Sequence, residues 1–222
     1  MNTPQSIEAP SELVKWLFAI VCLAVYGTVV AAYFVLIGRP MGFGLGFWSS
    51  WLAATAGFML ATSFAASSVS HFTGWPNMRL GYQKQIGVTA FWLCFIYCLT
   101  LWLVEPEVYW FGFWDNLGTP NFILGLSAMV IFGLMVIINS KPIAKYVEWP
   151  TISFFLNLGF VGYAFLVMRA ILLEWPIWSE WFMTFSGPPT NRLILSVLAM
   201  VVILLRLAVI IDRRYIHPRS PS

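Results

Sequence analysis

The stretch VKWLFAIVCLAVYGTVVAAYFVLI, residues 14–37, decides the fold class of this protein. Its single charged residue is Lys15, close to its start. About 20 consecutive apolar residues in a helix are enough to cross the hydrocarbon core of a bilayer, which is about 30 Å thick. Glu8 and Glu12 precede the stretch, and no small-residue cleavage site follows it. We therefore expect it to remain as a membrane helix and not to be removed as a signal peptide.

The composition indicates that the rest of the chain is built in the same way. Of 222 residues, 60% are hydrophobic and 9% are charged, whereas soluble domains have about 45–50% and about 25%. Continuous apolar runs, without the period-two alternation of a membrane barrel strand, occur at 14–37, 47–69, 85–104, 121–140, 151–173 and 193–211. The sequence predicts an all-α, polytopic membrane protein: a six-transmembrane-helix bundle over residues 14–211, an N-terminal segment at 1–13 and a basic tail at 212–222.

Lysine and arginine are divided unequally between the two sides of this predicted bundle. Of 12 such residues, most fall on the side that holds both termini: Lys15, Arg79, Lys84, Lys141, Lys145, Arg213, Arg214 and Arg219. Only Arg39 and Arg192 fall on the opposite side. Short cytoplasmic loops carry excess Lys and Arg, so both termini are predicted to be cytoplasmic and the membrane to be the inner (plasma) membrane. These residues flank apolar runs and do not cluster, so the net charge of +3 does not indicate a nucleic-acid partner.

Two patterns indicate contacts with neighbouring helices or molecules. Small residues at four-residue spacing form a stripe that favours close helix packing: Ala53, Gly57, Ala61 and Ala65. The predicted loops on the non-cytoplasmic side are rich in tryptophan: Trp110, Trp114, Trp175, Trp178 and Trp181. The last three follow one another at three-residue spacing, as on a short helix lying in the interface. These rings either anchor the protein as an aromatic belt or form an interfacial docking surface for a partner or pigment.

Ionisable residues that could carry chemistry are few. The two histidines, His71 and His217, both lie outside the predicted spans. A haem held by two imidazoles needs ligands at matching depth on facing helices, so no haem or metal site is predicted. Arg169 and Arg206 lie inside spans, where charge is costly and often functional. Each either extends to its nearest interface or forms a functional pair, with Glu174 as the candidate partner of Arg169.

Two longer stretches resemble the ferric reductase-like transmembrane domain family. They are SVSHFTGWPNMRLGYQKQIGVTAFWLCFIYCLT (68–100) and INSKPIAKYVEWPTISFFLNLGFVGYAF (138–165). Members follow the second span with a short basic loop and an R-x-x-x-G-x-x-A-F type start to the third helix, and a similar basic loop joins their spans four and five. The resemblance implies six helices with cytoplasmic termini. It also implies haem b held between helices, passing electrons across the membrane.

The haem ligands that the resemblance implies are histidines on spans three and five, and this sequence lacks them. Tyr97 stands near the position expected in span three, and Asn157 and Arg169 or Ala170 stand near the two positions expected in span five. No catalytic residue is carried over. The resemblance therefore implies a scaffold that has lost its cofactor.

The leading hypothesis from the sequence is a non-catalytic integral membrane scaffold or accessory subunit of a larger membrane complex, redox or photosynthetic. Its partners would be other integral membrane subunits and the lipid bilayer, and it would carry no cofactor of its own. One alternative is a haem b-binding electron-transfer subunit, with His71 and Tyr97 as candidate cofactor-binding residues. Another is a small-molecule transporter, in which Arg169 and Arg206 would be the internal charges of interest.

Overall fold

The computed structural model describes residues 11–37, 43–73 and 82–216. All regular structure in these residues is helical, and no strand occurs among them. Six helical stretches are long and apolar enough to cross a membrane: Glu12–Ile37, Leu45–Thr73, Gln83–Val104, Pro120–Ile138, Pro150–Thr184 and Asn191–Tyr215. Each overlaps one of the six predicted runs, which confirms the all-α prediction with six membrane-length helices. The side of the membrane on which each end lies stays a prediction.

The first span packs on the second through a glycine. It combines α1 (Glu12–Ala32) with the π-helical turn η1 (Tyr33–Ile37), and the second span is α2 (Leu45–Thr73). The Trp51 indole Nε1 donates a hydrogen bond to the Gly27 carbonyl oxygen at 2.8 Å. A Cβ atom at Gly27 would stand 2.7 Å from Cζ2 of that indole. The missing side chain at residue 27 therefore lets the ring reach the α1 backbone.

Helix α2 lies at the centre of the molecule. It contacts α1, α4 (Gln83–Val104) and α9 (Asn191–Ile211). In its most apolar window 50% of the residues are buried, against 11–22% in the other five spans. Gly57 of the predicted small-residue stripe faces α9, because a Cβ atom there would stand 2.9 Å from Leu195, and Ala61 is buried. These two residues of the stripe thus make contacts within the chain.

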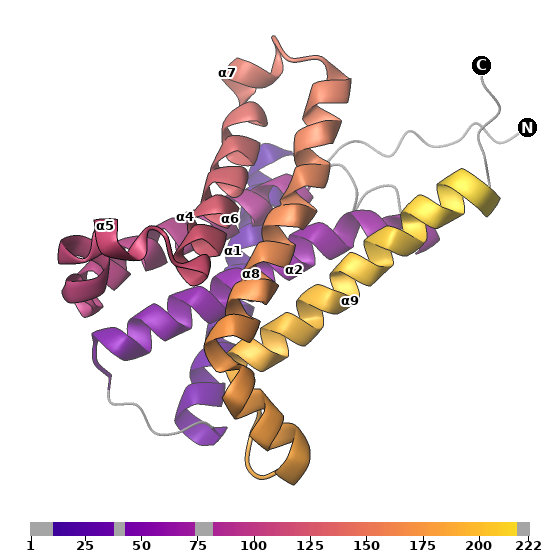
Figure 1. Ribbon diagram of the computed structural model, residues 1–222. Helices are drawn as coiled ribbons and strands as arrows, with labels where there is room; N and C mark the ends of the chain where they lie inside the picture. The colour runs from indigo at the N-terminus through magenta and orange to yellow at the C-terminus, as the bar shows by residue number, and fades with distance from the viewer. Residues whose placement is uncertain (1–10, 38–42, 74–81, 217–222) are drawn as a thin grey trace, which may run out of the picture.

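Helices α6 (Pro120–Ile138) and α8 (Trp149–Thr184) form an antiparallel pair joined through the short α7 (Lys141–Ala144). Figure 1 shows this pair standing side by side and crossing α2 and α9 at a steep angle. Between α4 and α6 the chain forms η2 (Glu107–Phe111) and α5 (Phe113–Asn116), which project from the side of the bundle. The two groups of helices therefore diverge from a common crossing region.

Helix α8 is longer than the fifth predicted span. The prediction ended at residue 173, before Glu174 and Pro176, but the helix has 36 residues and continues to Thr184, where Phe185 ends it in the left-handed conformation with φ 47°. The tryptophans at 175, 178 and 181 are thus on the continuation of a spanning helix, and the expected separate interfacial helix is not present. Helices tolerate a proline where neighbouring groups satisfy the freed carbonyl. The charge of Glu174 inside this helix is stabilised by hydrogen bonds from Trp178, Thr190 and Arg192.

The last helix also extends past its predicted end. Helix α9 continues into the π-helical turn η3 (Asp212–Ile216), so the described part of the predicted tail is helical. His71 Nε2 lies 2.8 Å from Asp212 Oδ2. At the start of α4, Gln85 Nε2 donates to Glu12 Oε2 at 3.3 Å. The start of α1, the end of α2, the start of α4 and the end of α9 therefore meet at one end of the bundle, which we call the terminal end.

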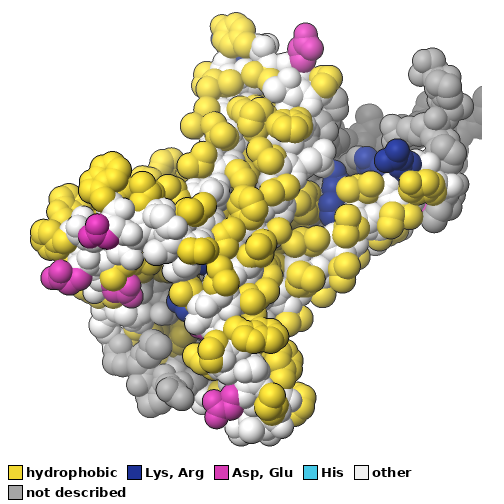
Figure 2. All heavy atoms as spheres, in the orientation of Figure 1, with side chains coloured by type: hydrophobic (Ala, Val, Ile, Leu, Met, Phe, Trp, Pro, Cys, Tyr) yellow, Lys and Arg dark blue, Asp and Glu magenta, His cyan; other side chains and the backbone are white. Residues whose placement is uncertain are grey.

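The larger of two buried clusters joins the two groups of helices. Its largest members come from α2, α4, α6 and α8 and include Met59, Phe64, Ile86, Phe132 and Tyr163. The rings of Phe64 and Phe160 lie 4.8 Å apart, which brings α2 against α8. Figure 2 shows hydrophobic side chains spread along the visible face of α6, α8 and α9, with charged side chains mostly toward the ends of these helices. Such a surface fits a chain whose helices face lipid.

Candidate functional site: an apolar pocket with two arginines

Five helices, α2, α4, α6, α8 and α9, surround a partly open pocket of about 160 Å³. We call it the Arg169 pocket. Its residues come from the first part of α2, α6 and α9 and from the later part of α4 and α8. The pocket therefore lies away from the terminal end, in the half of the bundle that we call the far half. Most of its wall is aliphatic or aromatic, as in small-molecule sites, although its volume is below their usual range of about 300–1,000 Å³.

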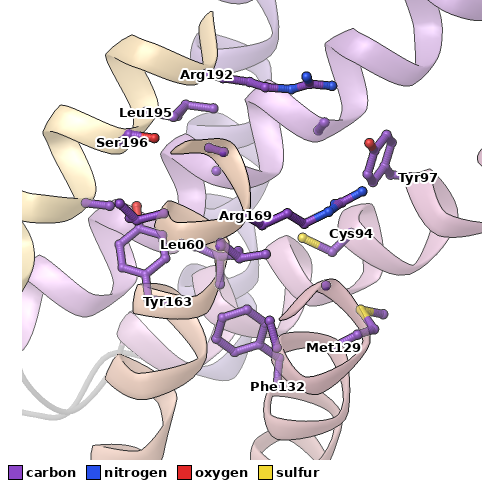
Figure 3. A pocket seen from close by; sticks show the side chains of 18 of the residues that line it. Leu60, Cys94, Tyr97, Met129, Phe132, Tyr163, Arg169, Arg192, Leu195 and Ser196 are labelled. Carbon is purple, nitrogen blue, oxygen red and sulfur yellow. The ribbon is translucent and has the colours of Figure 1, made fainter. Parts of the chain in front are cut away.

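Every charged residue that lines this pocket is basic. Arg169 comes from α8 and Arg192 from the start of α9, and no carboxylate is among the described residues of the wall. Figure 3 shows the two arginine side chains extending in the same direction, with Tyr97 of α4 on the side to which they point. The pocket thus combines an apolar body with a positively charged edge.

Arg169 is held by neutral groups. Its Nε donates to Asn121 Oδ1 at 2.9 Å, and its Nη2 lies 3.5 Å from the Tyr109 hydroxyl. Gly125 leaves room for it, because a Cβ atom there would stand 3.2 Å from Arg169 Nε. Within the described ranges, no carboxylate forms an ion pair with this guanidinium. A charge inside a membrane span without a counter-charge is costly, and such charges are usually paired.

Glu174, the candidate partner of Arg169, pairs with Arg192 instead. Glu174 Oε1 accepts from Arg192 Nη1 at 3.0 Å, and its Oε2 accepts from Trp178 Nε1 at 2.9 Å and from Thr190 Oγ1 at 2.7 Å. Residues four apart share a helix face, whereas residues five apart do not, so Glu174 faces Trp178 and not Arg169. This cluster fastens the last turns of α8 to the start of α9. It also buries the Trp178 ring, which is 4% exposed and does not face outward as an interfacial ring would.

Two hydroxyl groups lie in the pocket wall at mid-depth. Tyr163 of α8 is 3% exposed, and its hydroxyl has no hydrogen-bond partner within the described part of the chain. Ser196 of α9 is also buried and lines the same pocket. Figure 3 shows both side chains at the pocket wall. A buried donor without a partner costs about 1–3 kcal/mol, so a polar ligand atom placed beside Tyr163 would remove that cost.

The small-residue stripe of α2 is divided between the pocket and the core. Ala53 and Gly57 line the pocket, while Ala61 and Ala65 belong to the buried cluster or pack on it. Gly57 lets Leu195 of α9 approach α2 in this wall, because a Cβ atom at residue 57 would stand 2.9 Å from the Leu195 side chain. The stripe therefore forms part of a pocket wall and also allows close helix packing.

Arg206 is not part of the pocket. Its Nη2 donates to Asn157 Oδ1 at 2.6 Å, and its guanidinium carbon lies 5.2 Å from the centre of the Phe160 ring. Arg206 thus pairs with α8 inside the bundle, and the two intramembrane arginines have different neighbours. Asn157, one of the positions where the family resemblance implied a ligand, is a partner of this arginine.

The two candidate cofactor-binding residues lie in different halves of the molecule. His71 is in the last turn of α2 at the terminal end, bound to Asp212, whereas Tyr97 lines the Arg169 pocket in the far half. They therefore do not share a site. In the ranges that the structure describes, no group of three His, Cys, Asp or Glu residues could hold a metal ion. His217 is outside those ranges.

The tryptophans predicted for interfacial docking differ in exposure. Trp110, Trp114 and Trp175 are exposed. Trp181 donates through Nε1 to the Gly187 carbonyl oxygen at 3.0 Å, which ties the end of α8 to the turn that follows. Figure 2 shows hydrophobic and acidic side chains together where η2 and α5 project. An aromatic belt and a docking surface are both compatible with this arrangement.

Comparison with known proteins adds no relative. No protein-family model matches this sequence, and a search of curated proteins finds no significant match.

Four residues of the pocket region were not singled out from the sequence. Asn121, Tyr109 and Gly125 position Arg169, and Tyr163 supplies the unpaired hydroxyl. Of these four residues, only Asn121 could have been noticed in the sequence, because it is a polar residue at the start of an apolar run. Gly125 and Tyr163 are common residues of membrane helices, and only their neighbours in space show what they do.

Proposed function

We propose that this protein binds an amphipathic anion, a molecule with a negatively charged head and an apolar body, in the Arg169 pocket. The observation that carries this proposal is Arg169 itself. It is an intramembrane guanidinium that lines an apolar pocket and has no carboxylate partner within the described ranges. An anionic head beside it would supply the missing counter-charge.

The head of the ligand would provide the selectivity. Lipid tails are as apolar as leucine side chains, so moving an apolar chain from the bilayer into the pocket gains little free energy. A charge-assisted hydrogen bond contributes about 1.5–3 kcal/mol. Arg169, Arg192 and the Tyr163 hydroxyl are among the groups in the wall that offer donors to such a head. The apolar wall then accommodates the body of the molecule.

The test measures binding with a defined probe. The purified protein in nanodiscs is incubated with a photoreactive dodecyl sulfonate, and the labelled residues are mapped by mass spectrometry. We expect labels on residues that line the Arg169 pocket. The Arg169→Gln variant should lower the affinity about 10- to 100-fold, the equivalent of one charge-assisted hydrogen bond. Arg206→Gln is the matched control, because Arg206 is also an intramembrane arginine but lies outside the pocket.

Two further outcomes define the result. Equal labelling of the wild type and Arg169→Gln, or equal loss in both arginine variants, would contradict the proposal. A second arm uses a photoreactive anionic phospholipid. Labelling by the sulfonate alone indicates a single-chain ligand, and labelling by the phospholipid alone assigns the same chemistry to a bilayer lipid.

A second candidate function is that of an accessory subunit in a larger membrane complex. The observation that favours it is the projecting segment of η2 and α5, where Trp110, Phe111 and Trp114 are exposed together. Aromatic residues are enriched at protein interfaces. Purification in a mild detergent should then recover stoichiometric partners, and Trp110→Ala with Trp114→Ala should release them. A strictly monomeric protein would count against this candidate.

A further inference from the structure

A second pocket shares part of its wall with the Arg169 pocket. It measures about 230 Å³ and lies among α2, α4, α6 and α8. Its residues come from the first turns of α4, such as Gln83 and Gly87, and from the end of α6, such as Asn139. The first turns of α4 belong to the terminal end of the bundle. The second pocket therefore occupies the opposite half of the molecule from the Arg169 pocket, and we call it the Lys84 pocket.

Two side chains belong to the walls of both pockets. Leu60 of α2 and Phe132 of α6 line the Arg169 pocket and the Lys84 pocket alike. Both are almost fully buried, at 3% and 4% exposure. The Phe132 ring lies 6.2 Å from that of Phe64, which itself contacts the tilted rings of Phe160 and Tyr163. Leu60 and Phe132 thus form an apolar partition between two spaces that are stacked along the bundle.

The charges of the two pockets are of one sign. Arg169 and Arg192 line the far pocket and Lys84 lines the other, while no Asp or Glu is in either wall among the described residues. Gln83 and Asn139 add polar groups near Lys84. An amphipathic anion would therefore meet a basic residue in each half and an apolar partition between them. Rings of basic side chains select anions in membrane pores, and apolar constrictions gate them.

We propose that the two pockets are the halves of one transmembrane route for an amphipathic anion, and that Leu60 and Phe132 close this route in the present state. This inference rests on the proposed function. The charged head moves between Arg169 and Lys84, and the apolar body stays among the aliphatic and aromatic walls. Passage requires the two partition side chains to change rotamer or α6 to move relative to α2. The step involves no covalent chemistry.

The experiment measures transfer across the bilayer. The full chain is reconstituted in vesicles that contain a fluorescent (NBD-labelled) dodecyl sulfonate, and external dithionite destroys the label in the outer leaflet. The sulfonate stays charged, so it crosses a protein-free bilayer slowly. The rate at which the protected label is then lost reports transfer. The binding assay described above is carried out on the same preparations.

Variants of the partition should change the rate in opposite directions. Leu60→Ala and Phe132→Leu open space at the partition and should raise the rate by about tenfold or more, whereas Leu60→Phe fills it and should slow transfer. Leu52→Ala is the matched control, because Leu52 is on the same helix and packs on the core but lines neither pocket. Lys84→Gln should slow transfer and leave binding in the Arg169 pocket unchanged.

The outcomes separate the two proposals. If the probe binds the Arg169 pocket but its transfer is the same in all partition variants and in protein-free vesicles, the route is wrong and the proposed function stands. If the probe does not bind that pocket, the proposed function fails and the route fails with it. A faster rate in Leu52→Ala equal to that in Leu60→Ala would show a general leak and would also overturn the route.

Discussion

At the residue scale, the pocket depends on how each charge is balanced. Glu174 and Arg192 neutralise each other, and Arg206 is bound by the Asn157 amide and lies over an aromatic ring. Arg169 is held by the neutral groups of Asn121 and Tyr109. The three arginines of the bundle are therefore not equivalent, although all lie in or beside apolar runs. The one that faces the pocket without a carboxylate is the one that carries the proposed function.

The Glu174 cluster gives a prediction at this scale. Glu174→Gln removes the charge that accepts hydrogen bonds from Arg192, Trp178 and Thr190. Hydrogen bonds to a charged group contribute about 1.5–3 kcal/mol, so the free energy of unfolding should fall by about 1–3 kcal/mol. Thermal unfolding in detergent measures this. Glu180→Gln is the control, because Glu180 is an exposed carboxylate on the same helix, and an equal effect of both variants would contradict the cluster's role.

At the element scale, glycines determine how closely the helices cross. Gly27 brings α1 to α2, Gly57 brings α2 to α9, and Gly87 brings α4 to Ser63 of α2. Ser63 in turn donates to the Gln83 carbonyl oxygen at 2.9 Å. Close approach through small residues is the usual packing of membrane helices, which lack a hydrophobic driving force between them.

Gly159 of α8 gives the prediction at this scale, because two other helices reach its backbone. A Cβ atom there would collide with Met135 Sδ of α6 and stand 2.9 Å from the Phe64 ring of α2. The methionine end is flexible, but the phenylalanine ring is held among other rings. Gly159→Val should therefore lower the free energy of unfolding by about 1–3 kcal/mol, the usual cost of overpacking.

Denaturation in mixed micelles, followed by circular dichroism, would check this value. Gly46→Ala is the matched control, because Gly46 is also in a spanning helix and nothing lies within 4 Å of the added Cβ. The control should leave stability unchanged or raise it slightly. A stable Gly159→Val protein would mean that α6, α8 and α2 do not cross as described.

At the scale of the whole molecule, polar contacts define the terminal end. The pairs His71 with Asp212 and Gln85 with Glu12 join helices that are distant in sequence. The far half holds the Glu174 cluster and the contact of the Tyr33 hydroxyl with the Pro189 carbonyl oxygen. Between these polar ends the chain contacts itself mainly through apolar and small side chains. Such a division is expected of a protein that crosses a bilayer.

The orientation predicted from lysine and arginine is testable at this scale. In a background with Cys22, Cys94 and Cys98 replaced by serine, single cysteines are placed at three exposed positions. Leu13→Cys and Tyr215→Cys lie near the terminal end, and Trp114→Cys is in α5. In intact cells a membrane-impermeant maleimide should label Trp114→Cys only, and inside-out vesicles should reverse the pattern. Labelling of Leu13→Cys and Tyr215→Cys from opposite sides would contradict an even number of spans.

The sequence by itself determined the class of the fold. Six apolar runs are enough to predict six membrane-length helices, because the hydrocarbon core requires that length and the runs lack the alternation of a barrel strand, which leaves helices to satisfy the backbone. Helix ends were less predictable. Glu174 and Pro176 indicated an end at residue 173, yet α8 continues because Trp178, Thr190 and Arg192 bind the carboxylate.

Only the tertiary structure decided the candidate site. Arg169 and Arg206 are equivalent in sequence, as single charges inside apolar runs, and their roles separate only when Asn121, Gly125 and Asn157 are placed beside them. The same holds for Leu60 and Phe132, which are ordinary apolar residues until both pockets are seen to share them. The physical reason is that the hydropathy of a segment indicates whether that segment lies in the bilayer, and it depends on the segment alone. A pocket depends on which side chains from different helices meet, and that is a property of the packing.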